Sequence, residues 1–573
     1  MTTAASISVT ETLALLDKEF REFALAFSED GYAVWLGAGI SMGKLPGLEG
    51  VAESAIENLR GHIDPTNPAC PFKASLDNIL GLASLTKVEW EAVDYDAPVS
   101  TWAGIEAIRP RLVAQYANLL DQAPLGQDQD YLVWSAVDVV GTYANPAIDP
   151  GPEHLGLAAL VFEGVASDNA SANWDRLVEV AVDRMSGGDT SLLQVRVLPA
   201  DVKNNTTRAR LYKFHGCAWL AGQNGGDYRG RLVGRASQIH GWADQPENKV
   251  MAAKLQDLAT SKSTLMLGLS MQDTNIQNLF VVAKSNLPSD FPTAPPAVIL
   301  SEDKVGVNQR SFLKNFYKAD YAKKASEIEA SALLRAYAAA LLPALWLHVL
   351  CTKVEAFIAT LQPGFSPDEQ VRLVEGLRRL RDDAAKTAVP EAHEAFMLGA
   401  LPRFGRAMSL FRDGRALGAA DGYYRPLTTS PAAKVLADPG TPGSGLIEAA
   451  LGLALVGRGC ADGLWSCRVG DPADPKTGAL TVIGAGSGRA TPVFIVSNAR
   501  AAAKLVTDGH VAENDDAVLL HSQEVAPKGS RTPTAAPGRT GLRTLREIAL
   551  PTLATGTGNL DSAYQQFRSK VAP

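Results

Sequence analysis

Short apolar runs alternate with amphipathic segments over roughly the first half of the chain. The runs "YAVWL", "LLQVRVL", "ARLYKFHG", "STLMLGLS" and "PAVILS" each predict a strand, and segments such as "WDRLVEVAVDRM" between them have helical spacing. Short apolar strands that alternate with helices predict a parallel sheet with helices on both faces. We therefore expect an α/β, Rossmann-like fold, whose ligands bind at the carboxyl ends of the strands.

Three other regions have a helical pattern. Residues 10–27 predict one amphipathic helix, and residues 51–149 predict a helical insert that covers a site built by the preceding turn. Residues 324–414 predict helices only. Their most apolar stretch, residues 336–351, contains a proline and is shorter than the ~20 residues of a membrane span, so it predicts a buried helix.

The last part of the chain changes character again. After a Pro/Gly-rich linker at residues 425–445, apolar runs indicate a mixed α/β segment, which also contains a Pro/Gly/Thr-rich loop at residues 526–541. A chain of 573 residues is too long for one core. We expect an α/β domain over residues 1–325, a helical region over 326–430 and a mixed α/β sensing or assembly domain over 431–573.

Charge and cysteine content narrow the class of protein. The net charge of −8 gives no broad attraction to nucleic acid or to an anionic membrane. The five cysteines form no C-x-x-C pair, so the sequence predicts no zinc site and no metal. Their odd number and irregular spacing are typical of reduced thiols, and the N-terminus has no signal-peptide pattern, so we expect a cytoplasmic protein without membrane association.

Polar residues follow several of the predicted strands. The glycines of "GAGIS" (Gly37–Ser41) follow the first strand, where backbone N–H groups can approach a pyrophosphate because no Cβ intervenes. This turn is weak evidence alone, since Met42 replaces the third glycine of G-x-G-x-x-G. The stretches "SANWD", "KFHG", "GLSMQD" and "VILSED" place further polar groups at the ends of other strands.

The order of these motifs resembles the Sir2 (sirtuin) family. The series "GAGIS", "GPEHLGLAAL", "SANWD", "KFHG" and "GLS" follows the family's pattern over roughly residues 20–325. The two C-x-x-C pairs of a sirtuin zinc ribbon are missing, and "LPGLEG" has no arginine where deacylases carry one. The ending "GLSMQD" and the helical insert look like the Sir2-like domains of bacterial antiphage defence proteins. That resemblance implies NAD+ hydrolysis that depletes the infected cell of NAD+.

The resemblance also implies roles for individual residues. Asn173 would orient a water molecule or the ribose hydroxyls, His215 would accept a proton, and Asp175 would orient neighbouring groups or stabilise the positive charge that develops on the sugar. The implied NAD+ contacts are Gly37, Ala38, Gly39 and Ser41 at the pyrophosphate, Gly268, Ser270 and Asp273 at a phosphate or ribose, and Ser301 and Glu302 at the adenine ribose.

Plainer interpretations stand beside these roles. Asn173 is also a favoured N-cap for a helix near Trp174, and Asp175 suits a first helical turn in any case. His154 at a helix start is expected to be structural, and Cys217 is expected to be a packed thiol. The second glycine run, residues 481–496, lies between two strands and predicts a β-hairpin.

Three functions remain open from the sequence. The first is an NAD+ glycohydrolase, which we expect to be a homo-oligomer. For it the resemblance implies a partner ATPase, a short Argonaute or a phage trigger protein as possible partners. The second is an NAD-dependent protein deacylase without zinc. The third is a regulatory subunit that binds NAD or ADP-ribose without catalysis.

Overall fold

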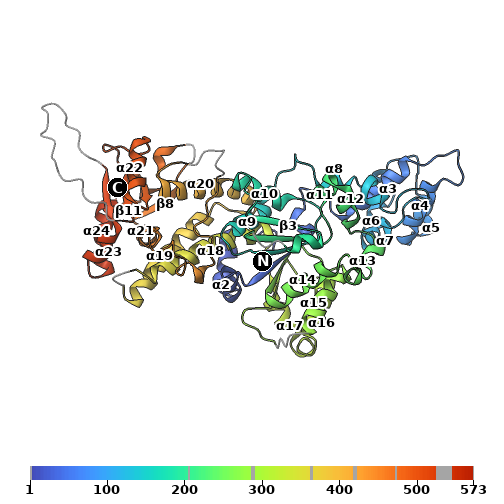
Figure 1. The fold of residues 1–573 in the computed structure, drawn as a ribbon, viewed down its shortest axis with the longest axis horizontal. Coiled ribbons are helices and arrows are strands. Elements are labelled where there is room, and N and C mark those ends of the chain that lie inside the picture. Colours follow the sequence, from blue (N-terminus) through green and yellow to red (C-terminus); the bar gives the residue numbers. More distant parts are fainter. Residues whose placement is uncertain are drawn as a thin grey trace.

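The computed structural model describes residues 3–203, 207–285, 291–361, 365–416, 423–471, 474–523 and 545–571. The molecule is elongated, with a large sheet near the middle of its long axis (Figure 1). Short helices lie at one end, a second sheet lies at the other, and long helices fill the space between the two sheets (Figure 1).

The first sheet has seven parallel strands in the order β3-β4-β2-β1-β5-β6-β7. Its strands are β1 (Tyr32–Leu36), β2 (Asp168–Ser171), β3 (Leu193–Arg196), β4 (Ala209–Lys213), β5 (Ser263–Leu267), β6 (Val298–Ser301) and β7 (Leu333–Leu334). The expected Rossmann-like α/β fold is therefore confirmed. The sheet grows from β1 first toward β2 and later toward β5, so the strand order reverses beside β1, where ligands bind in such sheets.

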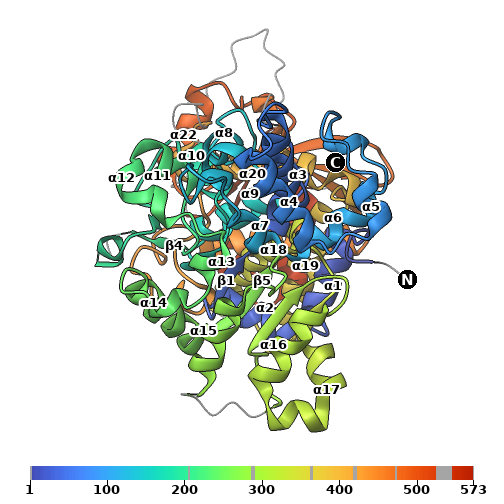
Figure 2. The same ribbon diagram turned by 90° about the vertical axis from the view of Figure 1, so that its right-hand side faces the viewer.

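Helices cover both faces of this sheet because side chains alternate along its strands. Val34 and Leu36 point into one apolar core, whereas Ala33 and Trp35 point into the other. The first face is covered by α1 (Val9–Asp17), α2 (Arg21–Ser28), α9 (Pro152–Phe162), α10 (Leu177–Ser186) and α18 (Ala338–Ile358). The second face is covered by α14 (Lys249–Ser261), α15 (Thr274–Ser285), α16 (Val307–Tyr317) and α17 (Ala319–Ala332), which gather on one side of β1 and β5 (Figure 2).

The expected helical insert is present and forms one end of the molecule (Figure 1). Its apolar core is separate from the two cores of the sheet and includes Leu59, Ile79 and Leu112. Its helices are α3 (Leu48–Gly61), α4 (Pro71–Leu82), α5 (Lys87–Glu91), α6 (Ile105–Ala114), α7 (Tyr116–Leu120) and α8 (Val139–Tyr143). The neighbouring α11 (Ala218–Gln223) contributes two alanines to the same core.

Helix α18 connects the two halves of the molecule. By length and composition it could cross a membrane, but 72% of its most apolar window is buried inside the protein, as expected of a core helix. It packs against α9 on one side and against α19 (Pro367–Ala385) and α21 (Leu446–Ala461) on the other. One apolar core consequently runs from the first sheet to the second.

A buried polar junction lies beside this core, where α9 ends. Lys353 of α18 and Glu163 are both 0% exposed, and Lys353 Nζ lies 2.7 Å from Glu163 Oε2. The ammonium also donates to the carbonyl oxygens of Glu163 and Thr428, at 2.7 and 3.0 Å. The Tyr424 hydroxyl and the Leu427 N–H donate to the other carboxylate oxygen of Glu163. This junction ties the first sheet's helical layer to the segment that follows α20 (His393–Asp413).

The second sheet has five strands in the order β12-β11-β10-β9-β8. Its strands are β8 (Trp465–Val469), β9 (Leu480–Gly484), β10 (Ala490–Val496), β11 (Val518–His521) and β12 (Arg546–Ala549). The last three are parallel, and the helices around them are α22 (Ala499–Thr507), α23 (Leu550–Gly556) and α24 (Leu560–Val571). Strands β9 and β10 pair antiparallel around the second glycine run, which confirms the predicted hairpin. The loop expected at residues 526–541 lies outside the described residues.

Two local expectations are wrong. Residues 10–27 form two helices, because the chain turns at Lys18 and the N–H of Phe20 bonds back to the Leu15 carbonyl, which buries the Phe20 ring. The stretch 324–414 is not entirely helical, since β7 pairs with β6 as an edge strand. The expected domain boundary after residue 325 falls inside α17, and the division into three parts stays a prediction.

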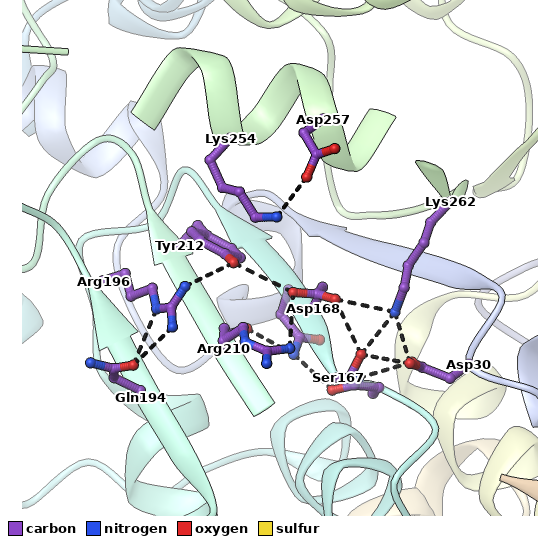
Figure 3. Close-up of polar contacts among 12 residues, drawn as sticks. Asp30, Ser167, Asp168, Gln194, Arg196, Arg210, Tyr212, Lys254, Asp257 and Lys262 are labelled. Atoms are coloured by element: carbon purple, nitrogen blue, oxygen red, sulfur yellow. Dashed lines mark hydrogen bonds and ion pairs between the residues drawn. The ribbon is translucent and has the colours of Figure 1, made fainter. Parts of the chain in front are cut away.

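Charged residues at the amino ends of β1, β2, β4 and β5 lie together, opposite the ligand edge (Figure 3). Lys262 Nζ lies 2.8 Å from Asp30 Oδ2 and 3.2 Å from Asp168 Oδ2, and it donates to the Ser167 hydroxyl at 2.8 Å. Burial raises the pKa of Asp168, but the charges of Lys262 and Arg210 outweigh it and hold that pKa below its usual range. This ionised cluster fixes the strands on the side away from the site.

Candidate functional site

Two glycine-containing loops meet at the carboxyl edge of β1 and β5. The N–H groups of Gly37 and Gly39 donate to the carbonyl oxygens of Leu267 and Gly268, both at 3.0 Å. A Cβ on Gly37 would lie 2.4 Å from the Gly268 oxygen, and one on Gly39 would lie 2.6 Å from the Gly268 Cα. Gly268 itself has a φ of +61°. These three glycines are required because two backbones touch here.

This contact changes what the first loop can offer a ligand. The N–H groups of Gly37 and Gly39 are engaged in the loop contact, so neither is free for a phosphate. Ala38 is exposed, and its N–H donates to no group that the structure describes. The next turn, Ala38–Ser41, is a single 3-10 turn that directs Ser41 inward. A pyrophosphate contact in this loop therefore depends on Ala38, and it stays a prediction.

Asn173 follows β2 and reaches the same loop. Its Nδ2 donates to the Gly37 carbonyl at 3.0 Å, and its backbone N–H donates to the Ser171 hydroxyl at 3.1 Å. It is not an N-cap, because α10 begins only at Leu177 and has no side-chain cap. Among the residues that the structure describes, no donor reaches its side-chain oxygen. The Asn173 amide is thus held in place by its Nδ2, and its Oδ1 accepts no hydrogen bond from the described residues.

Asp175, Ser41 and His154 form a buried chain of polar contacts. The Ser41 hydroxyl donates to Asp175 Oδ2 at 3.0 Å and lies 3.3 Å from His154 Nε2. The other oxygen of Asp175 accepts the N–H of Leu177 at 3.0 Å, so the carboxylate also stabilises the start of α10. The helix-start interpretation of Asp175 thus agrees with its contact to Leu177, and its role as a site carboxylate stays a prediction.

His154 lies in this chain of contacts although the sequence suggested only a structural role. Its Nδ1 accepts the N–H of Gly151 at 3.1 Å, which leaves the ring proton on Nε2, facing Ser41. Burial lowers the pKa of His154 to about 4, against the raising effect of the Asp175 charge. The ring is therefore neutral at pH 7 and donates toward Ser41. Its signal in the sequence was a histidine two residues after a helix-start proline.

His215 and Asp273 come together from the ends of β4 and β5. His215 Nε2 lies 3.0 Å from Asp273 Oδ2, and the side chains are 10% and 6% exposed. Burial raises the pKa of Asp273, but contact with His215 and backbone N–H groups outweigh it and lower that pKa. Asp273 also accepts the N–H of Asn275 at 2.7 Å. The contacts of Asp273 are thus with a histidine and a helix start.

The remaining expected contacts lie further along the edge. Ser270 is exposed on the loop after β5. Ser301 is buried at the end of β6, where its hydroxyl donates to the Ala336 carbonyl at 2.5 Å. Burial raises the pKa of the neighbouring Glu302. These residues lie along the same edge of the sheet, but the hydroxyl proton of Ser301 is already committed within the protein.

Lys213 is a buried charge below the site that the sequence pattern did not single out. Its ammonium donates to the main-chain oxygen of Asp175, lies 3.1 Å from Glu179 Oε1 and contacts Cys217 Sγ at 3.6 Å. Burial alone would lower the pKa of Lys213, but Cys217, Glu179 and Asp175 raise it above its usual value. This lysine fixes the backbone that carries Asp175, and Cys217 is packed beside it.

The helical insert reaches the site through aromatic side chains. The Tyr143 ring packs edge-on against Trp174 with centroids 5.6 Å apart, and its hydroxyl donates to the Pro46 carbonyl at 2.8 Å. Burial and the charge of Asp175 raise the pKa of Tyr143. The charge of Asp273 contributes, after burial, to a raised pKa of Tyr116. The insert therefore contributes aromatic side chains within electrostatic reach of both carboxylates.

No metal cluster accompanies this arrangement in the described part of the chain, where no three His, Cys, Asp or Glu side chains are grouped to hold an ion. No curated protein matches the sequence. A family model described as SIR2-like domain matches residues 170–322, from β2 into α17. The match begins after β1, so it includes Asn173, His215 and Asp273 but not the loop at Gly37. Residues 170–322 thus match the SIR2-like domain, whose members are in general NAD-dependent enzymes.

Proposed function

We propose that this protein is an NAD+ glycohydrolase, which uses water to cleave NAD+ into nicotinamide and ADP-ribose. The observation that carries the proposal is the convergence of an amide, a carboxylate and a histidine–aspartate pair at the ligand edge of a SIR2-like sheet. The missing C-x-x-C pairs and the missing arginine after "LPG" favour hydrolysis over deacylation.

The residues present fit a dinucleotide with a reactive ribose. The side-chain oxygen of Asn173 and the N–H of Ala38 have no partner among the described residues, so an acceptor and a donor are free at the edge. Cleavage of a glycosidic bond passes through an oxocarbenium-like state with positive charge on the sugar. The Asp175 carboxylate and the Asn173 oxygen are negative or partly negative groups that stabilise such a charge.

The histidine–aspartate pair supplies the proton acceptor. Asp273 facing Nε2 of His215 favours the tautomer with the proton on that nitrogen, which leaves Nδ1 as the basic atom. Nδ1 would take the proton released when water adds to the sugar, either directly or through a ribose hydroxyl. The chain from His154 through Ser41 orients Asp175 without supplying a charge of its own. Asp273 and His154 are thus positioning residues.

We propose further that the reaction serves antiphage defence by depleting NAD+ in the cytoplasm. Such an activity would be toxic if unregulated, so the C-terminal region, residues 326–573, would restrain it, form a homo-oligomer or bind a partner. An ATPase, a short Argonaute and a phage protein are the partner classes that the family resemblance implies. The basal rate of the isolated protein is expected to be low.

The test is release of nicotinamide from NAD+ by the full chain, alone and with candidate triggers. Asn173→Ala and His215→Ala should each lower the rate at least about 100-fold. Asn118→Ala and His240→Ala are matched controls, because both side chains are exposed outside the site, and they should keep full activity. Unchanged rates in both site variants would refute the site. Strict dependence on an acylated peptide would replace hydrolysis by deacylation.

A further inference from the structure

The loop that follows β1 is joined to the C-terminal region by an ion pair. Lys44 Nζ lies 2.8 and 3.0 Å from the two carboxylate oxygens of Glu394, which belongs to the first turn of α20. The two residues are 350 positions apart in the sequence. Their side chains are 26% and 44% exposed, so the pair is within reach of solvent. Helix α20 therefore contacts the loop of the candidate site through a pair that water and salt can weaken.

Lys44 belongs to the same turn that presents Ser41 to Asp175. The N–H groups of Lys44 and Leu45 both donate to the Ser41 carbonyl, at 3.1 and 3.0 Å. The Ser41 hydroxyl donates to one oxygen of Asp175, and the N–H of Leu177 donates to the other. Each oxygen of this carboxylate thus already has a partner within the protein. Because one turn sets the positions of Lys44 and Ser41, a shift of Lys44 changes the contact between Ser41 and Asp175.

The start of α9 lies beside Lys44 as well. A Cβ on Gly151, the N-cap of α9, would lie 3.5 Å from Lys44 Cε, 2.5 Å from Glu153 Oε2 and 3.6 Å from His154 Nδ1. Burial raises the pKa of Glu153 to about 7, although the charge of Lys44 opposes this rise. Two carboxyl groups, one of α9 and one of α20, are thus near Lys44. If Glu394 moves away, the Lys44 ammonium has a second carboxyl group beside it.

Helix α20 reaches from this loop to the second sheet. It has 21 residues, which gives a length of about 30 Å, and it lies between the second sheet and α10 (Figure 1). At its carboxyl end, the Phe411 carbonyl accepts the N–H of Ser497, just after β10, at 2.9 Å. Leu410 packs there in one apolar core with Val496 and Leu505. A displacement at the second sheet is therefore carried along α20 to Glu394, because a packed helix moves as a rigid element.

We propose that the Lys44–Glu394 pair is a restraining contact, which holds the Ser41 loop in its resting arrangement until movement of α20 releases it and the reaction accelerates. The proposal rests on the proposed NAD+ hydrolysis, and it assigns the regulation of that site to a named contact. An exposed ion pair contributes little to stability, which suits a contact that has to be broken. Glu153 then lies beside Lys44 in the released arrangement.

The first test is hydrogen exchange of the full chain without NAD+, measured by mass spectrometry on the peptide that covers residues 41–46. Lys44→Met and Glu394→Gln keep the side-chain lengths but remove the charges, and each should speed exchange about three- to fivefold. The double variant should exchange no faster than either single variant, since both remove the same contact. Added NaCl, at about 0.5 M, should speed exchange in the parent but not in the variants, because salt screens an exposed pair.

The matched control is Lys254→Met. Lys254 is 29% exposed and pairs with Asp257 at 2.6 Å within α14, so this variant breaks a comparable ion pair elsewhere. Exchange of residues 41–46 and its salt dependence should stay as in the parent. Melting temperatures of all variants are recorded alongside, and they should stay close to the parent value because these pairs are partly exposed.

The second test is release of nicotinamide from NAD+ without a trigger. Lys44→Met and Glu394→Gln should each raise the basal rate about three- to fivefold, and Lys254→Met should not. Unchanged exchange in both variants would overturn the proposal whatever the rates are. Faster exchange with a basal rate that stays the same or falls would also overturn it, because the contact would then restrain nothing. Release of nicotinamide by no protein, the triggered parent included, would refute the proposed hydrolysis, and the exchange data alone would then decide whether α20 holds the loop.

Discussion

Acidification should destabilise this protein through His154. The unfolded histidine titrates near 6.5, whereas the folded, buried ring has a pKa of about 4. Above pH 6.5 the His154 ring is neutral in both states, so its burial does not lower the free energy of unfolding. As the pH falls from 6.5 to 4, His154 binds a proton in the unfolded state but not in the folded state. The free energy of unfolding therefore falls over this pH range. At 1.36 kcal/mol per pKa unit the full loss is about 3 kcal/mol.

The variant His154→Gln isolates this effect. Glutamine can still accept from Gly151 and donate to Ser41, but it does not titrate. Between pH 7 and pH 4.5 the parent should lose about 2.5 kcal/mol more unfolding free energy in urea than the variant does. Ring NMR of the parent should show no His154 titration above pH 5. Equal losses in the two proteins, or a midpoint near 6.5, would refute the burial argument.

Three further outcomes follow from contacts elsewhere. Lys353→Met leaves the Glu163 carboxylate buried without its cation, so denaturant titration should show that the free energy of unfolding falls by about 3–5 kcal/mol. Adding Glu163→Gln should restore most of it. A loss below about 1 kcal/mol would contradict this reasoning. Gly268→Ala places a Cβ 2.6 Å from the backbone of the first loop, at a residue whose φ is +61°. This should lower the free energy of unfolding by about 1–3 kcal/mol. An unchanged melting temperature would count against the loop contact. Cys460 and Cys467, with sulfurs 3.3 Å apart, should react with hydrogen peroxide to give one disulfide and two waters, seen as a linked peptide by mass spectrometry; two separately oxidised cysteines would argue against pairing.

Strands β1, β3, β4, β5 and β6 could be predicted from the sequence, because each lies in a short run rich in apolar residues. Strand β2 has the polar sequence DNAS and lacks this signal. Strand β7 could not be predicted, because two leucines are too few to show the alternation of a strand, and only their pairing with β6 places them in the sheet. The break between α1 and α2 could not be predicted from the sequence either. The apolar spacing continues across Lys18 and Phe20, and only the tertiary burial of Phe20 shows that the chain turns there.

The edge of the site was predictable, but its pairings were not. Polar residues after strands point to one edge of a parallel sheet, which located Asn173, His215 and Asp273. That Asp273 contacts His215 depends on a loop after β5 reaching past two intervening strands. His154 contacts Ser41 across 113 positions in sequence, through the orientation of α9. Such contacts leave no local pattern.

Helix α9 bears on whether the two ends of this chain can be separated. One end of the helix carries His154 into the site, and the residue just past its other end, Glu163, is held by Lys353 and by residues after α20. A fragment cut before α18 would expose the apolar flank of α9 to water and leave Glu163 without its cation. We therefore do not expect the first sheet and its helices to fold as a portable module when the chain is cut before α18.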